Sequence, residues 1–340
     1  MGTTPRRTRI DLESIFRLTE LADYIIPFTI RAVCDLGVAD HLAGNPRSIE
    51  ELAEATGTHA PSLYRALRAL ACKGIFTEVE PGRFALTPMA EFLRADHPLS
   101  LKDAYPLIPA DVEAWAKLDY SVRTGKAAFD YVHGRGYWEY MNEHVEDADR
   151  FDRAQQAQTR LELPVLLRAY DWSIFGTLVD VGGGNGAFLG GVLARHVRLR
   201  GILFDQPQVI ARAEKVIHGL GVSERCQIIG GNFFEQVPRE ADAYLLKRIL
   251  YGCHDGEAVQ LLRTIRAAMR SDSRLLIIEP MDEPGGTDIS RRFDLAMLVM
   301  KGSGARSRDR LSALCGEAGL RVTAIRPTLM FPVIEAEPLG

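Results

Sequence analysis

The residues best placed to do chemistry surround a glycine-rich stretch in the second half of the chain. Residues 178–187 read LVDVGGGNGA, a short β-branched run followed by a turn. Glycine accepts positive φ angles and lets a ligand approach the backbone closely. Asp205 lies about 20 residues beyond the turn, where a carboxylate can bind both hydroxyls of a ribose. This spacing predicts a strand–turn–helix–strand unit that binds a nucleotide.

Two classes of nucleotide compete for this turn. Gly182, Gly184 and Ala187 match the looser dinucleotide fingerprint, which makes NAD one candidate. Against NAD, the unit lies in the second half of the chain, no second nucleotide half follows, and Asp180 occupies the strand end. An acid there suits a cationic ligand, and S-adenosylmethionine carries a sulfonium and an ammonium group but no phosphate. We therefore predict S-adenosylmethionine, with its amino-acid part at Asp180 and the glycine turn and its ribose at Asp205.

A second turn completes the expected cofactor site. Residues 226–234 read CQIIGGNFF, a strand that ends in a turn. Asn232 offers an amide that can hydrogen-bond adenine, and Phe233 offers a ring that can pack on it. Gln206, which follows the ribose-binding acid, belongs to the same set of cofactor residues.

Strands and helices alternate from Thr177 to the end of the chain. Strands are predicted at 177–181, 201–204, 226–229, 242–247 and 274–279, with one or two more near 321–334. Helices are predicted at 187–196, 207–219, 256–270, 288–300 and 307–318. This order indicates an α/β fold with a Rossmann-like, doubly wound sheet, whose ligand lies at the carboxyl ends of the strands.

The first part of the chain predicts a smaller, helical domain at 1–100. Residues 15–42 have helical spacing and a wide apolar face, which suits either a dimer contact or a core helix. Residues 48–86 indicate a helix, a turn, a second helix and a two-stranded wing, opened by a capping box of Ser48 and Glu51. A winged helix makes DNA binding an alternative function, although acidic residues surround it.

Residues 101–170 form a predicted helical linker that is rich in aromatic side chains, ahead of a cofactor domain at 171–340. Such side chains suit a core or a wall for a flat aromatic substrate. The segment 129–136 is predicted to break the helices and to place His133 on a loop. The candidates for substrate contact are Trp115, Phe129, Arg292 and Met297.

Composition argues against several other classes of protein. The 340 residues carry a net charge of −4, which disfavours a general nucleic-acid or anionic-membrane binder. No apolar run is long enough to span a membrane, and the polar N-terminus lacks the apolar core of a secretion signal. The five cysteines are scattered, without the spacing of metal ligands. We expect reduced thiols, no metal and a cytoplasmic protein.

Several motifs resemble those of one family over nearly the whole chain. They are VDVGGGNG, FDQPQVI, GNFF, the LLK segment, LLIIEP and the tail MLVMKGSGARSRDRLSALCGEAGL. The chain is similar to the class I S-adenosylmethionine-dependent O-methyltransferases that act on plant phenolics and on bacterial polyketides, anthracyclines and phenazines. The resemblance implies an aromatic or polyketide-type substrate and a homodimer formed through the winged-helix domain. It also implies a cofactor site lined by Gly182, Asp205, Asn232, Phe233 and Lys247.

The chain departs from this family at the general base. In the family a histidine four residues after the lysine removes the phenolic proton, and an aspartate follows it; here Tyr251 and Gly252 stand at these positions. The pair His254–Asp255 is a false match, because the segment aligns without a gap. Of two supporting glutamates, Glu279 is kept, whereas the other position holds Arg308. A neutral tyrosine with a pKa of about 10 is a poor base at neutral pH.

Three interpretations follow from this departure. In the first, the protein methylates a phenol that a nearby carbonyl acidifies and that needs little beyond proximity, or His133 or His254 serves as the base. In the second, the protein binds S-adenosylmethionine but catalyses hydroxylation, decarboxylation or cyclisation of a polyketide-like substrate. In the third, it is a non-catalytic partner that binds the cofactor. Tyr251 could donate a hydrogen bond to the substrate, and Glu279 could orient whatever group replaces the histidine.

Overall fold

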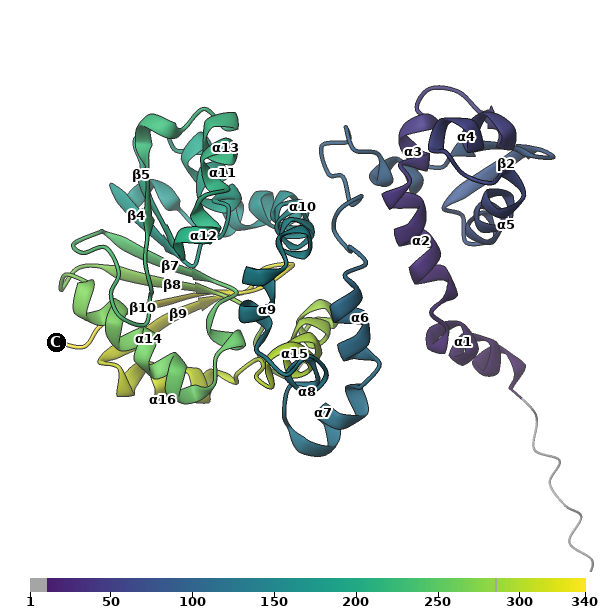
Figure 1. The fold of residues 1–340 in the computed structure, drawn as a ribbon. Helices are drawn as coiled ribbons and strands as arrows, with labels where there is room; N and C mark the ends of the chain where they lie inside the picture. Colours follow the sequence, from purple (N-terminus) through teal and green to yellow (C-terminus); the bar gives the residue numbers. More distant parts are fainter. Residues whose placement is uncertain (1–10, 285) are drawn as a thin grey trace, which may run out of the picture. The chain divides into compact units, whose positions relative to one another are not determined.

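The computed structural model describes residues 11–284 and 286–340. They divide into two compact units, the first ending at Leu107 and the second beginning at Ile108 (Figure 1). The helices expected as a linker at 101–170 therefore fall within the second unit from Ile108 onward. Within the described residues, no helix has both the length and the apolar composition needed to cross a membrane.

The first unit contains the predicted helix–turn–helix and its wing. Its elements are α1 (Leu12–Ala22), α2 (Ile25–Asp35), α3 (Val38–His41), β1 (Arg47–Ser48), α4 (Ile49–Thr56), α5 (Ala60–Ala71), β2 (Phe76–Glu80), β3 (Arg83–Leu86) and η1 (Ala90–Leu93). The three strands form an antiparallel sheet in the order β1-β3-β2. Ser48 and Glu51 make the expected capping box at the start of α4. Buried side chains such as Leu52, Leu67 and Phe84 form the core of this unit.

The single helix predicted at 15–42 is wrong, because the chain forms three helices there. The Asp23 carboxylate accepts the backbone N–H of Ile25, which satisfies a donor at the start of α2 and separates it from α1. Gly37 has a φ of 68°, a left-handed conformation that ends the helical run before α3. Polar capping and one glycine therefore override the continuous apolar spacing of the sequence.

The second unit is built on a seven-stranded sheet of order β6-β5-β4-β7-β8-β10-β9. The strands are β4 (Thr177–Val181), β5 (Arg200–Asp205), β6 (Cys226–Gly230), β7 (Ala243–Lys247), β8 (Arg274–Ile278), β9 (Leu320–Arg326) and β10 (Val333–Pro338). The pairs from β6 to β8 are parallel, and β10 runs antiparallel to both of its neighbours. The predicted α/β, Rossmann-like sheet is confirmed.

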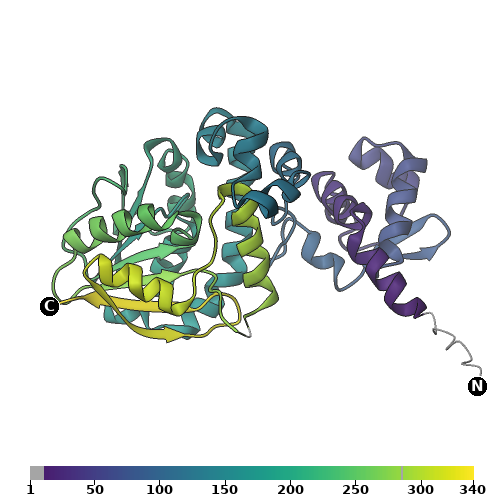
Figure 2. The same ribbon diagram turned by 90° about the horizontal axis from the view of Figure 1, so that it is seen from below.

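Helices cover both faces of this sheet, as Figure 2 shows for the second unit. They are α6 (Pro109–Trp115), α7 (Leu118–Thr124), α8 (Ala128–His133), α9 (Tyr137–Glu143), α10 (Val145–Ala169), α11 (Ala187–Arg195), α12 (Pro207–Ile210), α13 (Ala213–Gly219), α14 (Asp255–Ala268), α15 (Asp288–Lys301) and α16 (Arg308–Glu317), with the short turns η2 (Trp172–Ile174), η3 (Ser223–Arg225) and η4 (Leu250–Gly252). Helices α14 and α16 pack on one face, and α10, α11 and α13 pack on the other. The helix predicted at 207–219 is broken into α12 and α13.

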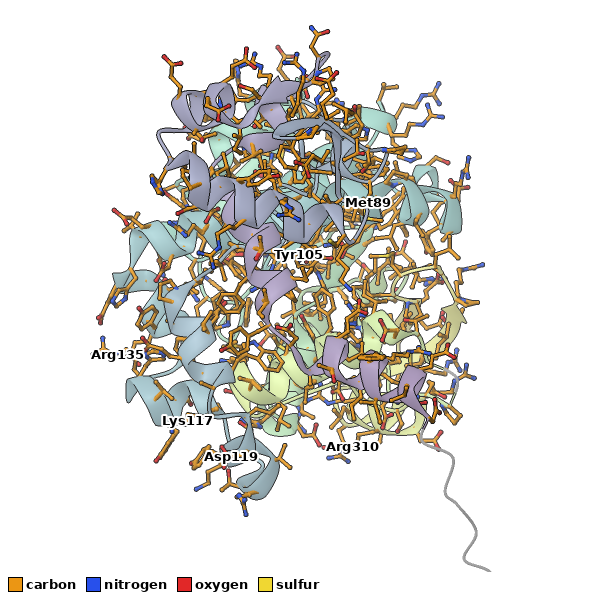
Figure 3. The ribbon with its side chains drawn as sticks, turned by 90° about the vertical axis from the view of Figure 1, so that its right-hand side faces the viewer. Met89, Tyr105, Lys117, Asp119, Arg135 and Arg310 are labelled. Atoms are coloured by element: carbon orange, nitrogen blue, oxygen red, sulfur yellow. The ribbon has the colours of Figure 1, made fainter. Side chains whose placement is uncertain are left out.

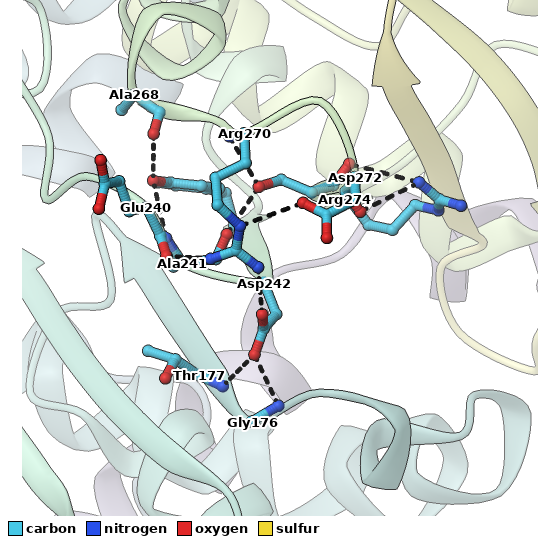
Figure 4. A network of polar contacts seen from close by, with 11 residues as sticks. Gly176, Thr177, Glu240, Ala241, Asp242, Ala268, Arg270, Asp272 and Arg274 are labelled. Carbon is cyan, nitrogen blue, oxygen red and sulfur yellow. Dashed lines mark hydrogen bonds and ion pairs between the residues drawn. The ribbon is translucent and has the colours of Figure 1, made fainter.

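A polar network fixes the amino-terminal edge of the sheet. The Asp242 carboxylate accepts the backbone N–H groups of Gly176 and Thr177 at 2.7 and 2.8 Å, and it is also bound by the Arg270 guanidinium (Figure 4). The Ser273 hydroxyl donates to the Ala241 carbonyl at 2.7 Å in the same region. These contacts hold the starts of β4, β7 and β8 together, at the edge opposite to the carboxyl ends where a ligand is expected.

Candidate functional site

The glycine turn joins β4 to α11 and leaves part of its backbone open. Gly182 and Gly184 have φ angles of 73° and 61°, a region that favours glycine. A Cβ atom placed on Gly182 would lie 2.7 Å from the Ile249 side chain, whereas one on Gly184 would meet no heavy atom within 4 Å. The turn therefore packs tightly on its Gly182 side and offers an open backbone at Gly184.

Asp205 lies at the carboxyl end of β5 and is bound to the turn. Its two carboxylate oxygens accept the backbone N–H groups of Gly184 at 2.8 Å and Gln206 at 2.7 Å. Burial raises the pKa of this carboxyl above its ordinary value, although the two N–H groups act in the opposite direction. Each carboxylate oxygen keeps further acceptor capacity, so the acid can still bind the hydroxyls of a ribose.

Asp180 is buried beneath the glycine turn, with 2% of its surface exposed. A Cβ atom on Gly183 would lie 2.7 Å from its carboxyl group, so the residue supports the turn from below. Burial raises the pKa of Asp180 to about 7, and Lys247 acts against this rise. Its predicted contact with the amino-acid part of the cofactor stays a prediction.

A cavity of about 520 Å³ lies beside the carboxyl ends of β5 and β6. It is lined by Gln206, Pro207, Gln208, Gly231, Asn232 and Phe234. The Asn232 side chain accepts the backbone N–H of Phe234 at 3.0 Å and donates to Glu235 at 2.9 Å, so the turn is rigidly formed. Phe233 packs edge-on against Phe234, with ring centroids 4.7 Å apart. Of the predicted cofactor residues, Gln206 and Asn232 thus line the cavity.

The residues of this edge fit S-adenosylmethionine. They offer an acid for a ribose at the end of β5, an open glycine backbone at Gly184 and an adjoining cavity with an amide and aromatic rings. The groups available to contact a ligand here are carboxylates and neutral groups, which suits a cationic ligand without phosphate.

Lys247 ends β7 and forms a buried ion pair with Glu162 of α10. The Lys247 Nζ lies 2.5 Å from the Glu162 Oε2 and 5.3 Å from the centre of the Phe188 ring. Burial lowers the pKa of Lys247 to about 8. Burial alone would raise the pKa of Glu162, but Arg248 and Lys247 hold it below its ordinary value. Sequence reasoning missed Glu162, because nothing in a helical sequence marks one acid as buried.

Tyr251 lies on η4 with its side chain buried, at 6% exposed surface. Burial raises the pKa of its hydroxyl to about 12, so the side chain stays protonated and can donate a hydrogen bond but cannot act as a base. Glu279 accepts the backbone N–H of Tyr251 at 3.1 Å. This carboxylate therefore fixes the backbone of the turn and does not orient a catalytic side chain. Arg306, which sequence reasoning also missed, donates to the carbonyls of Leu250 and Cys253 at 2.7 and 2.6 Å.

The two candidate histidines have structural partners of their own. His133 lies in the last turn of α8 and not on a loop, because the helix continues until Gly134, whose φ is 68°. Its Nε2 lies 3.0 Å from the carbonyl oxygen of Ala110. His254 is exposed and caps α14, where its backbone N–H donates to Glu257 at 2.8 Å. Their service as a base stays a prediction that neither contact supports.

Two of the four substrate candidates, Phe129 and Met297, belong to one cluster of apolar side chains, whereas Trp115 and Arg292 are exposed. The sulfur of Met297 lies 3.6 Å from a Cβ atom placed on Gly252, so this side chain packs against the turn that carries Tyr251. Phe129 is fully buried in a cluster of helices, and Arg292 is exposed and pairs with Asp288 at 2.8 Å. Trp115 is 38% exposed at the end of α6, near Lys117 and Asp119, which point outward in Figure 3. Met297 is the candidate that lies beside Tyr251.

Comparison with known proteins identifies this arrangement. Residues 115–321 match the O-methyltransferase domain family, and residues 19–96 match the O-methyltransferase dimerisation domain. The chain belongs to the O-methyltransferase family. It is 37% identical to phenazine O-methyltransferase PhzM of Lysobacter antibioticus, over 100% of both chains. It is 36% identical to the mitomycin biosynthesis 6-O-methyltransferase of Streptomyces lavendulae, over 89% of this chain and 88% of the relative.

A solved structure supports the same assignment. An O-methyltransferase from neocarzinostatin biosynthesis, in complex with S-adenosylmethionine and 2-hydroxy-5-methyl naphthoic acid, superposes with a TM-score of 0.80. The two chains are 32% identical, over 94% of this chain and 98% of the other. The protein is thus an S-adenosylmethionine-dependent O-methyltransferase, and the prediction of its family and cofactor is confirmed.

We expect Asp205→Asn to weaken S-adenosylmethionine binding by about 10- to 100-fold, because hydrogen bonds to a charged partner contribute on the order of 1.5–3 kcal/mol. Isothermal titration calorimetry on the full chain measures the change. Asp272→Asn, at an exposed acid on the opposite edge of the sheet, serves as the control. Equal affinity of the Asp205 variant and the wild type would contradict the predicted ribose contact.

Glu279 predicts a dependence of stability on pH. Burial raises its pKa from 4.5 to about 7. The stability that this raised pKa contributes is therefore fully present below about pH 4.5 and is lost as the pH rises through 7. Between pH 5 and 8, the free energy of unfolding of the wild type should fall by on the order of 2–3 kcal/mol for this reason. Glu279→Gln stays neutral and should not show this fall. Urea denaturation at both pH values tests this, with the exposed Glu317→Gln as control. The prediction fails if the Glu279 variant and the wild type lose the same amount.

Proposed function

We propose that this methyltransferase acts on a phenolic hydroxyl of a flat aromatic natural product, and that none of the side chains at η4 serves as its general base. The observation that carries the proposal is the burial of Tyr251, which raises the pKa of its hydroxyl to about 12. Its backbone N–H is bound by the Glu279 carboxylate. The names of the relatives, which refer to a phenazine and to mitomycin, support the class of acceptor.

The cofactor, when bound, supplies an electrophilic methyl group on a sulfonium, so the acceptor needs alignment more than activation. Asp205 and the cavity at Asn232 would hold its nucleoside part, next to the glycine turn. Tyr251 donates a hydrogen bond to an oxygen of the acceptor, and Met297 forms part of the apolar wall beside it. The buried aromatic side chains Phe129 of α8 and Tyr137 of α9 supply more apolar surface around the acceptor.

The decisive experiment incubates the full chain with S-adenosylmethionine and a panel of hydroxyphenazines and hydroxynaphthoates. We expect S-adenosylhomocysteine together with a product that is heavier by one methyl group in mass spectrometry. Tyr251→Phe should lower kcat/KM by about tenfold, because one hydrogen bond to the acceptor is lost. Tyr131→Phe, at a 59% exposed tyrosine, should behave as the wild type.

Two results would count against this function. One is binding of the cofactor without S-adenosylhomocysteine from any acceptor. The other is a hydroxylated or decarboxylated product without loss of the cofactor's methyl group, which would favour the second interpretation of the sequence.

We further propose that two copies of the chain associate through α1. Every residue of this helix is exposed within the described chain, and Ile15, Phe16, Leu18 and Leu21 are 50–74% exposed. An apolar face of this size normally lies in an interface. The match of residues 19–96 to a dimerisation domain supports the same conclusion.

The double substitution of Ile15→Asp and Leu18→Asp should therefore convert a dimer into a monomer, because each buries a charge at the proposed contact. Sedimentation equilibrium measures the mass, and circular dichroism checks that the chain remains folded. Arg17→Asp, on the polar face of α1, is the matched control and should leave the dimer intact. A dimer of unchanged affinity in the double variant would refute the proposed interface.

A further inference from the structure

Arg248 is a buried cation that shares the Glu162 carboxylate with Lys247. Its side chain is 7% exposed, and its two terminal nitrogens donate to the neutral amides of Gln155 and Gln158 on α10. Its Nε lies 3.7 Å from Glu162, whose other oxygen is 2.5 Å from Lys247. Among the described residues, this Nε has no hydrogen-bond partner. Two buried cations thus share one carboxylate, which leaves an excess of positive charge that a protein interior does not tolerate cheaply.

The backbone at Arg248 is also unusual. Its φ is 61°, a left-handed conformation that costs a non-glycine residue free energy. The backbone N–H donates to the Ile278 carbonyl at 2.8 Å, which fixes this conformation at the end of β7. The strained turn lies between Lys247 and the short turn that carries Tyr251. Its effect is to direct the guanidinium toward α10 and α15, where it lies 5.6 Å from the centre of the Phe293 ring.

The charged and titratable groups around the Arg248 guanidinium do not neutralise its positive charge. Glu162 faces it from α10, Lys247 precedes it on β7, and the protonated Tyr251 lies near it on η4. Glu279 and Asp180 lie deeper, and burial raises the pKa of each to about 7, so that neither is fully ionised at neutral pH. On α15, Asp294 is bound to the backbone N–H of Ala305 at 2.6 Å. A bound sulfonium would add one more positive charge to this edge.

We propose that Arg248 determines acceptor specificity by binding the acceptor hydroxyl as an anion. This inference rests on the proposed function and names its substrate class: phenols that ionise near neutral pH. The acceptor O–H bond breaks, the proton passes to the solvent, and the oxygen keeps the electron pair and faces the guanidinium. No side chain has to take the proton, which is compatible with a protonated Tyr251 at the family's histidine position. An opposite charge within 4–6 Å typically lowers the pKa of an acid by roughly 1–3 units.

The ionisation of a bound acceptor can be measured without turnover. The probes are 4-nitrophenol and 4-nitro-1-naphthol, whose phenolates absorb visible light, bound to the full chain with S-adenosylhomocysteine. We expect the pKa of the bound probe to be at least about one unit below that of the free probe, and the phenolate to bind about tenfold tighter than the phenol. A bound pKa equal to or above the free value would overturn the proposal, as would failure of the phenolate to bind at millimolar concentration.

Substitutions assign the effect to this residue. Arg248→Gln should abolish the shift in the pKa of the probe, whereas Arg248→Lys, which keeps the charge, should retain part of it. Arg321→Gln, at an exposed arginine of β9 that pairs with Glu337, is the matched control and should keep the full shift. Circular dichroism verifies that each variant is folded. An undiminished shift in a folded Arg248→Gln variant would overturn the role of Arg248.

Kinetics separate this inference from the proposed function. With acceptors of graded acidity, the rise of kcat/KM with pH should end at the pKa of each acceptor. A break at one fixed pH for all acceptors would indicate a base on the protein and would contradict the proposal. Absence of S-adenosylhomocysteine with every phenol would refute the methyl transfer itself, while the absorption measurement would still decide whether Arg248 binds an anion.

Discussion

The ion pair of Lys247 and Glu162 connects the two structures on which the site depends. Lys247 ends a central strand, and Glu162 comes from the long helix α10, so the pair holds this helix against the carboxyl edge of the sheet. Because both side chains are buried, removal of either partner would leave an uncompensated charge. The same helix supplies the glutamines that bind Arg248, and it therefore determines which charges face a ligand.

The amino-terminal and carboxyl edges of the sheet differ in their polar contacts, and this difference explains why the carboxyl edge can bind ligands. At the amino-terminal edge, Asp242 ties backbone N–H groups together and leaves little unsatisfied. At the carboxyl edge, the backbone at Gly184 is open and is bound by the Asp205 carboxylate. A methyl transfer depends on such fixed positions, because the acceptor oxygen, the methyl carbon and the sulfur must be aligned.

The turn at Tyr251 illustrates how a family scaffold can keep its cofactor site while its acid–base chemistry changes. Glu279 and Arg306 bind the backbone of this turn, so its position does not depend on the side chain that it carries. A histidine or a tyrosine can occupy the same place, and the fold alone does not decide which chemistry follows. In the proposal above, the buried cation Arg248 compensates for the lost base by binding the acceptor as an anion.

The sequence by itself determined the sheet, its cofactor edge and the family, because the glycine turn, Asp205 and the alternation of strands and helices are local patterns. The sequence also showed that Tyr251 stands where the family has its histidine, because Tyr251 lies four residues after Lys247. The tertiary structure decided what surrounds that residue. Gln155 and Arg248 are 93 positions apart in the chain, and no local pattern predicts that contact or the burial of Glu162. The loop expected at His133 was wrong, because α8 continues through this residue and ends at Gly134, whose φ is 68°.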